Sequence, residues 1–422
     1  MVNILLLSVL GIFLLFSLAF VVKSKALKKR ALKKVSAMNT KASANWTVDF
    51  LEKKRKLTDD LADSTVAIIM AKKEELQINH LFGMITRDSD HLPDDAPAEI
   101  KEYFNKTAIL PDWADQDLID LGQQVYIRHG IWISLLLSNK SLPECYACAK
   151  GAEVLHRTAR LDEQHGSMNT FSRRIAETAQ FVVFAMSPGG LSPNGRGLVA
   201  IQKVRLIHAV IRYHLRKQNW DAAQYDEPIN QEDMAGTLMS FSALILEGME
   251  QLGIVLEPVE KEAYIHCWRV IGHVIGLHDD IIPANSADAL KLGYSILDHQ
   301  IAHSDQGSAL MRALLEFQNR NAKAIMSSES NIAMIRMMMG AKISDLMDVP
   351  KIEQSKIDKL NLKIKRIANV MEKLDHSLVL AMLLQFFTKH MSLYMISHMT
   401  KSKIINFYIP RSLRSDWTGP NR

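Results

Sequence analysis

Apolar residues recur along most of this chain at intervals of three and four positions, the period of an α-helix with one buried face. Strict alternation of apolar and polar residues, which is typical of a half-buried strand, is scarce. The helical pattern predicts helices over the following segments: 46–76, 114–138, 142–161, 171–186, 197–217, 231–252, 258–276, 285–302, 307–346, 352–371 and 374–399. Clusters of Pro, Gly and Asp predict breaks, for example at 88–97, 187–197 and 283–286. We therefore expect an all-α fold, a single large helical globule with the character of a bundle.

The 422 residues, of which 48% are hydrophobic, suffice for one large domain or two intimately packed ones, with a core that can enclose a cofactor. The three cysteines, Cys145, Cys148 and Cys267, are too few for a disulfide framework and fit a reducing compartment. Cys145 and Cys148 lack the second pair that a zinc site needs and the following His of a covalent haem attachment. We interpret them as small residues of a packed helix.

The first 22 residues, MVNILLLSVLGIFLLFSLAFVV, contain no charged side chain. A helix of this length crosses ~30 Å of hydrocarbon, whereas a cleaved signal peptide begins with basic residues and has a shorter apolar core. Residues 1–22 are therefore predicted to be an uncleaved transmembrane anchor. Seven basic residues and no acidic ones follow within 23–34. Positive charge beside a span favours the cytoplasmic side, so we expect a single-pass protein with its N-terminus outside or lumenal and its bulk cytoplasmic.

The basic residues of 23–34 could also contact anionic headgroups or a nucleic acid. The chain carries a net charge of +5, so the remainder without these seven residues is about −2 (5 − 7). Such a body has no positive field that would hold a polyanion, and no nucleic-acid partner is expected. We interpret residues 23–75 as a basic juxtamembrane and helical stalk, and residues 76–412 as the functional domain.

One apolar helix carries a histidine flanked by two arginines, in the segment Lys203-Val-Arg-Leu-Ile-His-Ala-Val-Ile-Arg212. Arg205, His208 and Arg212 share one face, because positions i−3 and i+4 lie beside position i on a helix. A neutral imidazole is the commonest metal ligand, and a single His often holds haem iron. Two arginines beside it could pair with the haem propionates. The alternative is an ordinary packed histidine whose neighbouring arginines reach solvent.

A second polar face lies on the preceding helix, in Phe171-Ser-Arg-Arg-Ile-Ala-Glu-Thr-Ala-Gln-Phe181. Arg174, Glu177 and Thr178 share that face by the same helical spacing. The Gly- and Pro-rich run 187–197 ends the helix and turns the chain back. The two polar faces are therefore expected to meet.

Together, the pattern R-x-x-E-T, the glycine-rich turn and the pattern K-V-R-L-x-H-A-x-x-R resemble the latex-clearing rubber oxygenases and their relatives, which include the ER-bound oxygenase of mycophenolic acid biosynthesis. The later segment 264–283, YIHCWRVIGHVIGLHDDIIP, is also similar, and the resemblance covers roughly residues 75–412. It implies one haem b with His208 as iron ligand, cofactor-anchoring positions at Arg205 and Arg212, and distal-side positions at Arg174 and Thr178. Residues 76–412 would then be a haem-binding oxygenase domain.

Glu177 departs from the family pattern, because the latex-clearing branch has a lysine there that can cap the iron when substrate is absent. A carboxylate could instead act as a proton acceptor, a general base or a weak oxygen ligand. It could also simply pair with Arg174 and hold that side chain in place.

The resemblance implies a haem-dependent oxygenase that uses O2 to cleave a carbon–carbon double bond of an apolar, isoprenoid-like or unsaturated lipid substrate. Two other functions stay open, a non-catalytic membrane-tethered haem sensor or carrier and a haem-free helical metalloenzyme. The clustered methionines of 334–340 and 382–399 fit either a lipid pocket or plain core packing.

Overall fold

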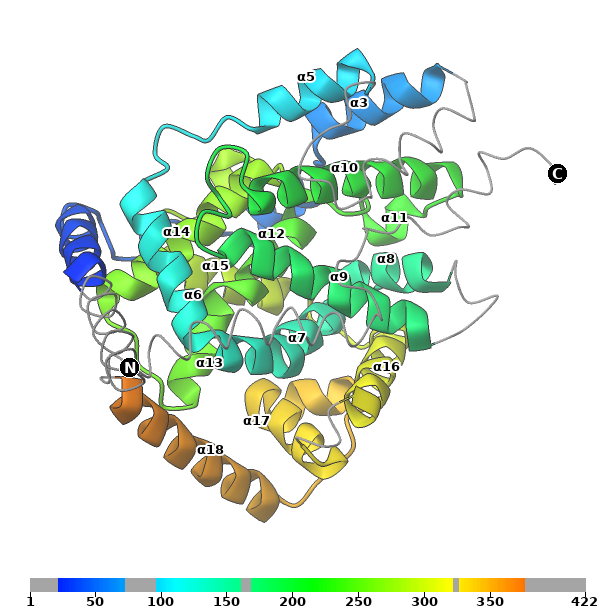
Figure 1. The fold of residues 1–422 in the computed structure, drawn as a ribbon. Coiled ribbons are helices and arrows are strands. Elements are labelled where there is room, and N and C mark those ends of the chain that lie inside the picture. Colours follow the sequence, from blue (N-terminus) through cyan, green and yellow to red (C-terminus); the bar gives the residue numbers. More distant parts are fainter. Residues whose placement is uncertain (1–21, 73–95, 161–167, 322–325, 376–422) are drawn as a thin grey trace, which may run out of the picture.

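The computed structural model describes residues 22–72, 96–160, 168–321 and 326–375 (Figure 1). Within these ranges the regular structure is helical, with one isolated bridge between Cys148 and Ile301. The prediction of an all-α helical globule is therefore confirmed.

A helix over residues 22–35 comes first among the described elements. The helices that follow are α2 (Val48–Arg55), α3 (Asp60–Ala71), α5 (Ala98–Thr107), α6 (Gln116–Leu136), α7 (Leu142–Ala147), α8 (Ala149–Arg160), α9 (Met168–Met186), α10 (Arg196–Lys217), α11 (Ala222–Tyr225), α12 (Gln231–Phe241), α13 (Ala243–Gln251), α14 (Pro258–Val274), α15 (Ser286–Gln300), α16 (Asp305–Asn321), α17 (Ser328–Leu346) and α18 (Gln354–Asp375). A π-helical turn, Leu137–Ser141, joins α6 to α7, and a 3-10 turn, Asp279–Ile281, precedes α15.

The pair formed by α6 and α14 is central to the main core. Gly122 of α6 makes the close crossing possible, because a Cβ there would lie 2.3 Å from the carbonyl oxygen of Ala263. Helices α12, α13 and α15 pack around this pair, while α10 lies between α9 and α3 (Figure 1). The long apolar side chains of Leu136, Leu198 and Tyr264 are fully buried in this core.

Several predicted helices are divided in the structure. The segment predicted as 46–76 breaks at residues 56–59, where Asp59 leaves the helical conformation and its side chain caps α3 by accepting from the backbone N–H of Ala62. The segment 231–252 breaks at Ser242, and the segment 307–346 is divided into α16 and α17. Helix α5 was not predicted at all. The segment 374–399 lies, beyond Asp375, outside the described residues.

Much of the predicted stalk packs against the body. Leu51 of α2 belongs to the main core, and Arg55 is fully buried among carboxylates of the α11–α12 region. The boundary at residue 75 stays a prediction. The anchor predicted over 1–22 lies, apart from Val22, outside the described residues. No helix in the described ranges combines the length and the apolar character that crossing a bilayer requires.

Candidate functional site

Helices α9 and α10 form an antiparallel pair joined by the glycine-rich loop 187–195. Gly197, at the start of α10, lies directly against α9, because a Cβ there would be 2.5 Å from Cα of Ala185 and 2.6 Å from the carbonyl oxygen of Phe184. From this contact, eleven residues back along α9 lead to Arg174 (185 − 11) and eleven forward along α10 lead to His208 (197 + 11). At ~1.5 Å per residue, both lie about 16 Å from the contact. The two predicted polar positions therefore stand at the same level of the helix pair.

His208 is a neutral histidine with an unpartnered ring nitrogen. Its Nδ1 is buried without a hydrogen-bond partner, and the residue as a whole is partly buried. Burial lowers the pKa of the imidazole to about 3, and the nearby positive charge of Arg212 acts in the same direction. The ring is therefore neutral at physiological pH, which is the form that binds metals.

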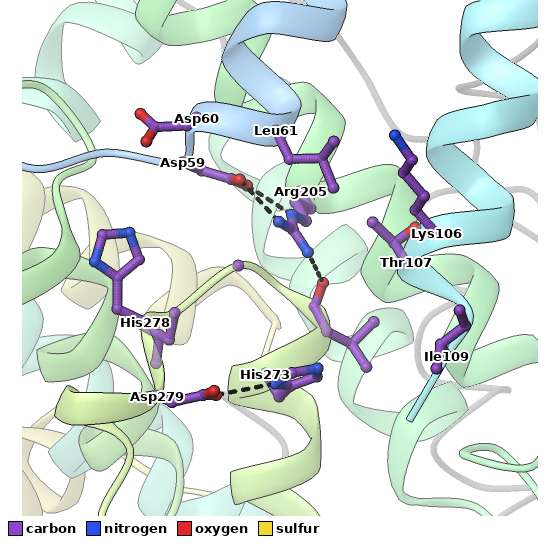
Figure 2. A pocket seen from close by; sticks show the side chains of 13 residues that line it. Asp59, Asp60, Leu61, Lys106, Thr107, Ile109, Arg205, His273, His278 and Asp279 are labelled. Carbon is purple, nitrogen blue, oxygen red and sulfur yellow. Dashed lines mark hydrogen bonds and ion pairs between the residues drawn. The ribbon is translucent and has the colours of Figure 1, made fainter. Parts of the chain in front are cut away.

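Arg205 is bound by a carboxylate from the N-terminal part of the chain. Its Nε lies 2.6 Å from Oδ2 of Asp59, its Nη2 lies 2.8 Å from Oδ1 of the same side chain, and its Nη1 donates to the carbonyl oxygen of Val274 at 3.0 Å (Figure 2). Burial opposes the charge, but the pair with Asp59 outweighs it and raises the pKa of Arg205. Three nitrogens of the guanidinium are thus engaged.

Arg212 is held in the same way, one turn further along α3. Its Nε lies 2.7 Å from Oδ1 of Asp63 and its Nη1 donates to the carbonyl oxygen of Ile229 at 3.3 Å. Its side chain is fully buried. Asp59 and Asp63 stand four residues apart, so the beginning of α3 offers one carboxylate to each arginine of the predicted face. In the structure each guanidinium is thus paired with a carboxylate of the chain itself, and anchoring of haem propionates by these arginines stays a prediction.

Each of the three residues on the predicted polar face of α9 makes a hydrogen bond or an ion pair in the structure. Glu177 pairs with Arg173, Oε1 to Nε at 2.9 Å, across the i,i+4 spacing. Arg174 instead donates from Nη1 to the carbonyl oxygen of Leu155 at 3.0 Å. Burial lowers the pKa of Arg174, and the charge of Glu177 acts in the opposite direction. Electrostatic pairing of Glu177 with Arg174 therefore stays a prediction. Thr178 donates its hydroxyl to the carbonyl oxygen of Arg174 at 2.9 Å.

A cavity of about 370 Å³ opens beside Arg205 (Figure 2). Its wall comes from the start of α3, the end of α5, α10, the end of α14 and the segment after it. Charged and polar side chains such as Asp59, Lys106 and Arg205 alternate there with apolar ones such as Leu61 and Ile109. His273 Nδ1 lies 3.2 Å from Oδ1 of Asp279 on one side of the cavity. His208 does not line this cavity.

The methionines of 334–340 contribute to core packing. Met334 and Met338 are buried in the main core, and Met339 is buried in a second cluster with residues of α16. The second methionine cluster, 382–399, lies outside the described residues.

Within the described ranges, no group of three or more His, Cys, Asp and Glu side chains could hold a metal ion. The cysteines Cys145, Cys148 and Cys267 are free thiols, and burial raises the pKa of Cys145 to about 12. A thiol in this state is a poor nucleophile, which agrees with a packing role.

Sequence reasoning missed the partners of the site residues. Asp59 and Arg205 are 146 positions apart, and Asp63 and Arg212 are 149 apart. The i,i+4 spacing of the two aspartates was visible, but nothing in the local pattern connected it with α10.

Three comparisons with known proteins bear on this site. The family described as "ER-bound oxygenase mpaB/B'/Rubber oxygenase, catalytic domain" matches residues 142–370, more than half of the chain. A rubber oxygenase from Streptomyces sp. (strain K30) is 28% identical over 263 residues, which are 61% of this chain and 62% of that protein. The chain thus matches less than two thirds of the length of that relative. The structure of latex clearing protein LCP in the closed state aligns with a TM-score of 0.68 and 24% identity, over 85% of this chain and 95% of that one. This last likeness shows a common fold, and helices α9 and α10 lie within the residues that the family matches.

Proposed function

Because the chain belongs to the family of ER-bound mpaB and rubber oxygenase catalytic domains, we propose that it is an oxygenase that holds haem b through His208. The observation that carries the proposal is His208, a neutral imidazole with an unpartnered buried Nδ1 that stands between Arg205 and Arg212 on a helix inside the matched residues. His266 also has an unpartnered Nδ1, but its Nε2 already accepts from the backbone N–H of Asp115. His208 therefore fits the axial ligand of a haem.

Haem, when bound, would supply the activation of O2. The chain itself supplies the surroundings. Arg174 is oriented by the carbonyl oxygen of Leu155, and its position on α9 is level with that of His208 on α10. Its positive charge would therefore lie near the haem. Glu177, fixed by Arg173, offers carboxylate oxygens that can accept a proton. The hydroxyl of Thr178 donates to the backbone of its own helix, so only its oxygen lone pairs remain to accept a further hydrogen bond.

Arg205 and Arg212 would bind the propionates only by giving up present contacts. Asp59 and Val274 engage all three nitrogens of Arg205, and Arg212 is fully buried beside Asp63. In the structure, both guanidinium groups are positioned by Asp59 and Asp63. The two aspartates thus hold the arginines in place on the same face as His208.

We further propose an apolar substrate of isoprenoid or unsaturated-lipid character, in which O2 cleaves a carbon–carbon double bond. The name of the rubber oxygenase relative and the apolar segment 1–22 support this class. Attachment through that segment, with the N-terminus outside or lumenal and the catalytic domain cytoplasmic, would bring the active site to a substrate that partitions into the bilayer.

Substitution of His208 tests the haem assignment. His208→Ala should abolish haem retention, measured as pyridine haemochrome per protein, while the far-ultraviolet circular dichroism stays helical. His214→Ala is the matched control, because His214 is also a buried histidine on α10 and lies outside the predicted face. Stoichiometric haem with an unaltered spectrum in His208→Ala would refute the assignment.

Oxygen uptake separates the oxygenase from the other functions. Full-length protein that retains haem should consume O2 when an alkenyl substrate such as a polyisoprene oligomer is added, with carbonyl products. Haem without substrate-dependent uptake would indicate a sensor or carrier. Activity in preparations free of haem would indicate a metalloenzyme of another kind.

A further inference from the structure

The helix over residues 22–35, dark blue in Figure 1, is attached to the body by its inner face. Leu27, Ala31 and Val35 recur every fourth position, and all three are buried. They form a cluster with apolar residues near the beginnings of α6 and α14, namely Leu118, Leu121, Val259 and Ala263. The basic segment that the sequence presents as a charge run is therefore a packed helix.

Ion pairs fix this helix along both edges of the buried row. They are Lys28–Glu257 at 2.6 Å, Lys28–Glu260 at 3.1 Å, Arg30–Asp117 at 2.9 Å, Lys34–Asp115 at 2.5 Å and Lys34–Asp117 at 3.0 Å. The four carboxylates belong to the N-terminal ends of α6 and α14, where acidic side chains cap the helices. One basic helix thus bridges two helix N-termini, and its orientation on the body is set.

The opposite face of the helix is a row of lysines without ion pairs among the described residues. Lys25, Lys29 and Lys33 are exposed and stand four positions apart. Val22 and Leu32, which are 60% and 54% exposed, lie on the same side of the helix. At 100° per residue these five side chains occupy a sector of about 100° on the side away from the buried row. We call this sector the lysine face.

We propose that the lysine face binds an anionic lipid surface. The combination of lysines with exposed apolar side chains is that of a helix lying at a membrane interface. The uncharged segment 1–21 directly precedes it. The rest of the chain has a net charge of about −2 (5 − 7), so the attraction is confined to this face and does not suit a nucleic acid.

The ion pairs with α6 and α14 determine how lipid binding by the lysine face would act on the rest of the protein. Because the helix is attached to α6 and α14, lipid binding orients the whole body relative to the bilayer. The proposal rests on the membrane attachment proposed above and is independent of the haem chemistry.

Amine footprinting of the full-length protein tests the proposal directly. The protein is reconstituted in bilayers of phosphatidylcholine alone, and of phosphatidylcholine with phosphatidylserine, and is treated with a water-soluble acylating reagent. Lys25, Lys29 and Lys33 should react about fivefold more slowly in the anionic bilayers. Lys359 and Lys363, exposed on α18, serve as internal controls and should react equally in both.

Each other outcome overturns the proposal in a recognisable way. Equal reactivity in both bilayers means that the face does not recognise charge. Protection already present in detergent means that a second copy of the chain covers it. Protection in detergent that appears only on adding duplex DNA means that the partner is a nucleic acid. Membrane attachment itself is read separately by flotation, so its failure is distinguishable from failure of the lysine face.

A variant provides a second, independent readout. The triple substitution Lys25→Gln, Lys29→Gln and Lys33→Gln should slow association with anionic vesicles at low salt about tenfold, and the difference should vanish at high salt. The control removes the same charge from α18 by Lys359→Gln, Lys363→Gln and Lys365→Gln, and should associate like the unmodified protein. Equal rates for both triple variants would show that only net charge matters and would overturn the proposal.

Discussion

Replacement of Gly276 by alanine is expected to disturb the ion pair between Asp59 and Arg205 that attaches α10 to α3. Gly276 follows α14 with a φ of +97°, and a Cβ there would lie 2.4 Å from Oδ2 of Asp59 and 2.8 Å from Nε of Arg205. The substitution therefore forces these two side chains apart. It changes no group that would touch haem or substrate.

The expected loss in the free energy of unfolding is the sum of two contributions. An L-residue at positive φ costs ~1–2 kcal/mol. Loss of one charge-assisted contact between Asp59 and Arg205 costs a further ~1.5–3 kcal/mol. Gly276→Ala should thus lower the free energy of unfolding by about 3–5 kcal/mol. Gly253→Ala isolates the first cost, because Gly253 has a φ of +86° and its nearest neighbour is Cγ of Lys365 at 3.8 Å.

Thermal unfolding of the two haem-free variants measures the difference. For a chain of 422 residues, each kcal/mol lowers the Tm by about 1 °C, so Gly276→Ala should melt about 2–3 °C below Gly253→Ala. Haem titration of the two proteins should show weaker binding only in Gly276→Ala. Equal melting temperatures and equal haem affinities would refute the idea that the Asp59–Arg205 pair positions α10.

Three further predictions concern other parts of the molecule. Glu177→Gln should retain haem but lose most turnover in an oxygen-uptake assay, whereas Arg173→Gln, which removes only its partner, should lose less; full activity of Glu177→Gln would exclude a proton-accepting role. Arg55→Met removes the fully buried cation that pairs with Asp226, Glu232 and Asp233, although Asp226 keeps its lysines, and should cost about 3–5 kcal/mol in denaturant unfolding. Arg216→Met, in a largely exposed pair, should cost at most about 1 kcal/mol; similar losses would contradict the assignment. Burial, assisted by a neighbouring arginine, lowers the pKa of His266 from 6.5 to about 4, so the folded state binds fewer protons than the unfolded state in this interval. The free energy of unfolding should therefore fall as the pH falls from about 6.5 to about 4, and the fall should be shallower in His266→Gln.

The sequence predicted those elements whose ends carry local signals. Helix α10 begins after a glycine-rich loop, α14 begins at Pro258, and α15 begins after Asn285, whose side chain caps it; all three agree with the prediction within about two residues. The periodic pattern could not show that the helix predicted over 46–76 breaks before Asp59. The break depends on the cap that Asp59 provides and on its distant partner Arg205.

For the candidate site, the sequence predicted which residues share a helix face but not which residues they contact. The shared face of Arg205, His208 and Arg212 follows from helical spacing alone. The choice of partner does not, because an arginine pairs with whichever carboxylate the tertiary fold brings near it. The basic run 23–34 shows the same limit, since its inner residues pair with acidic caps such as Asp117 and Glu257 that lie far along the chain. Long-range choices of this kind are set by packing, which leaves no trace in a local pattern.

The pairs between α3 and α10 impose an order on the synthesis of the protein. Asp59 leaves the ribosome 146 residues before Arg205, so at about 5–20 residues per second it waits roughly 7–30 s for its partner. During that interval Asp59 and Asp63 lack the arginines that pair with them in the folded protein. A nascent chain that ends before α10 should therefore carry two unpaired carboxylates at the beginning of α3. Chaperones and proteases would encounter the protein in that form.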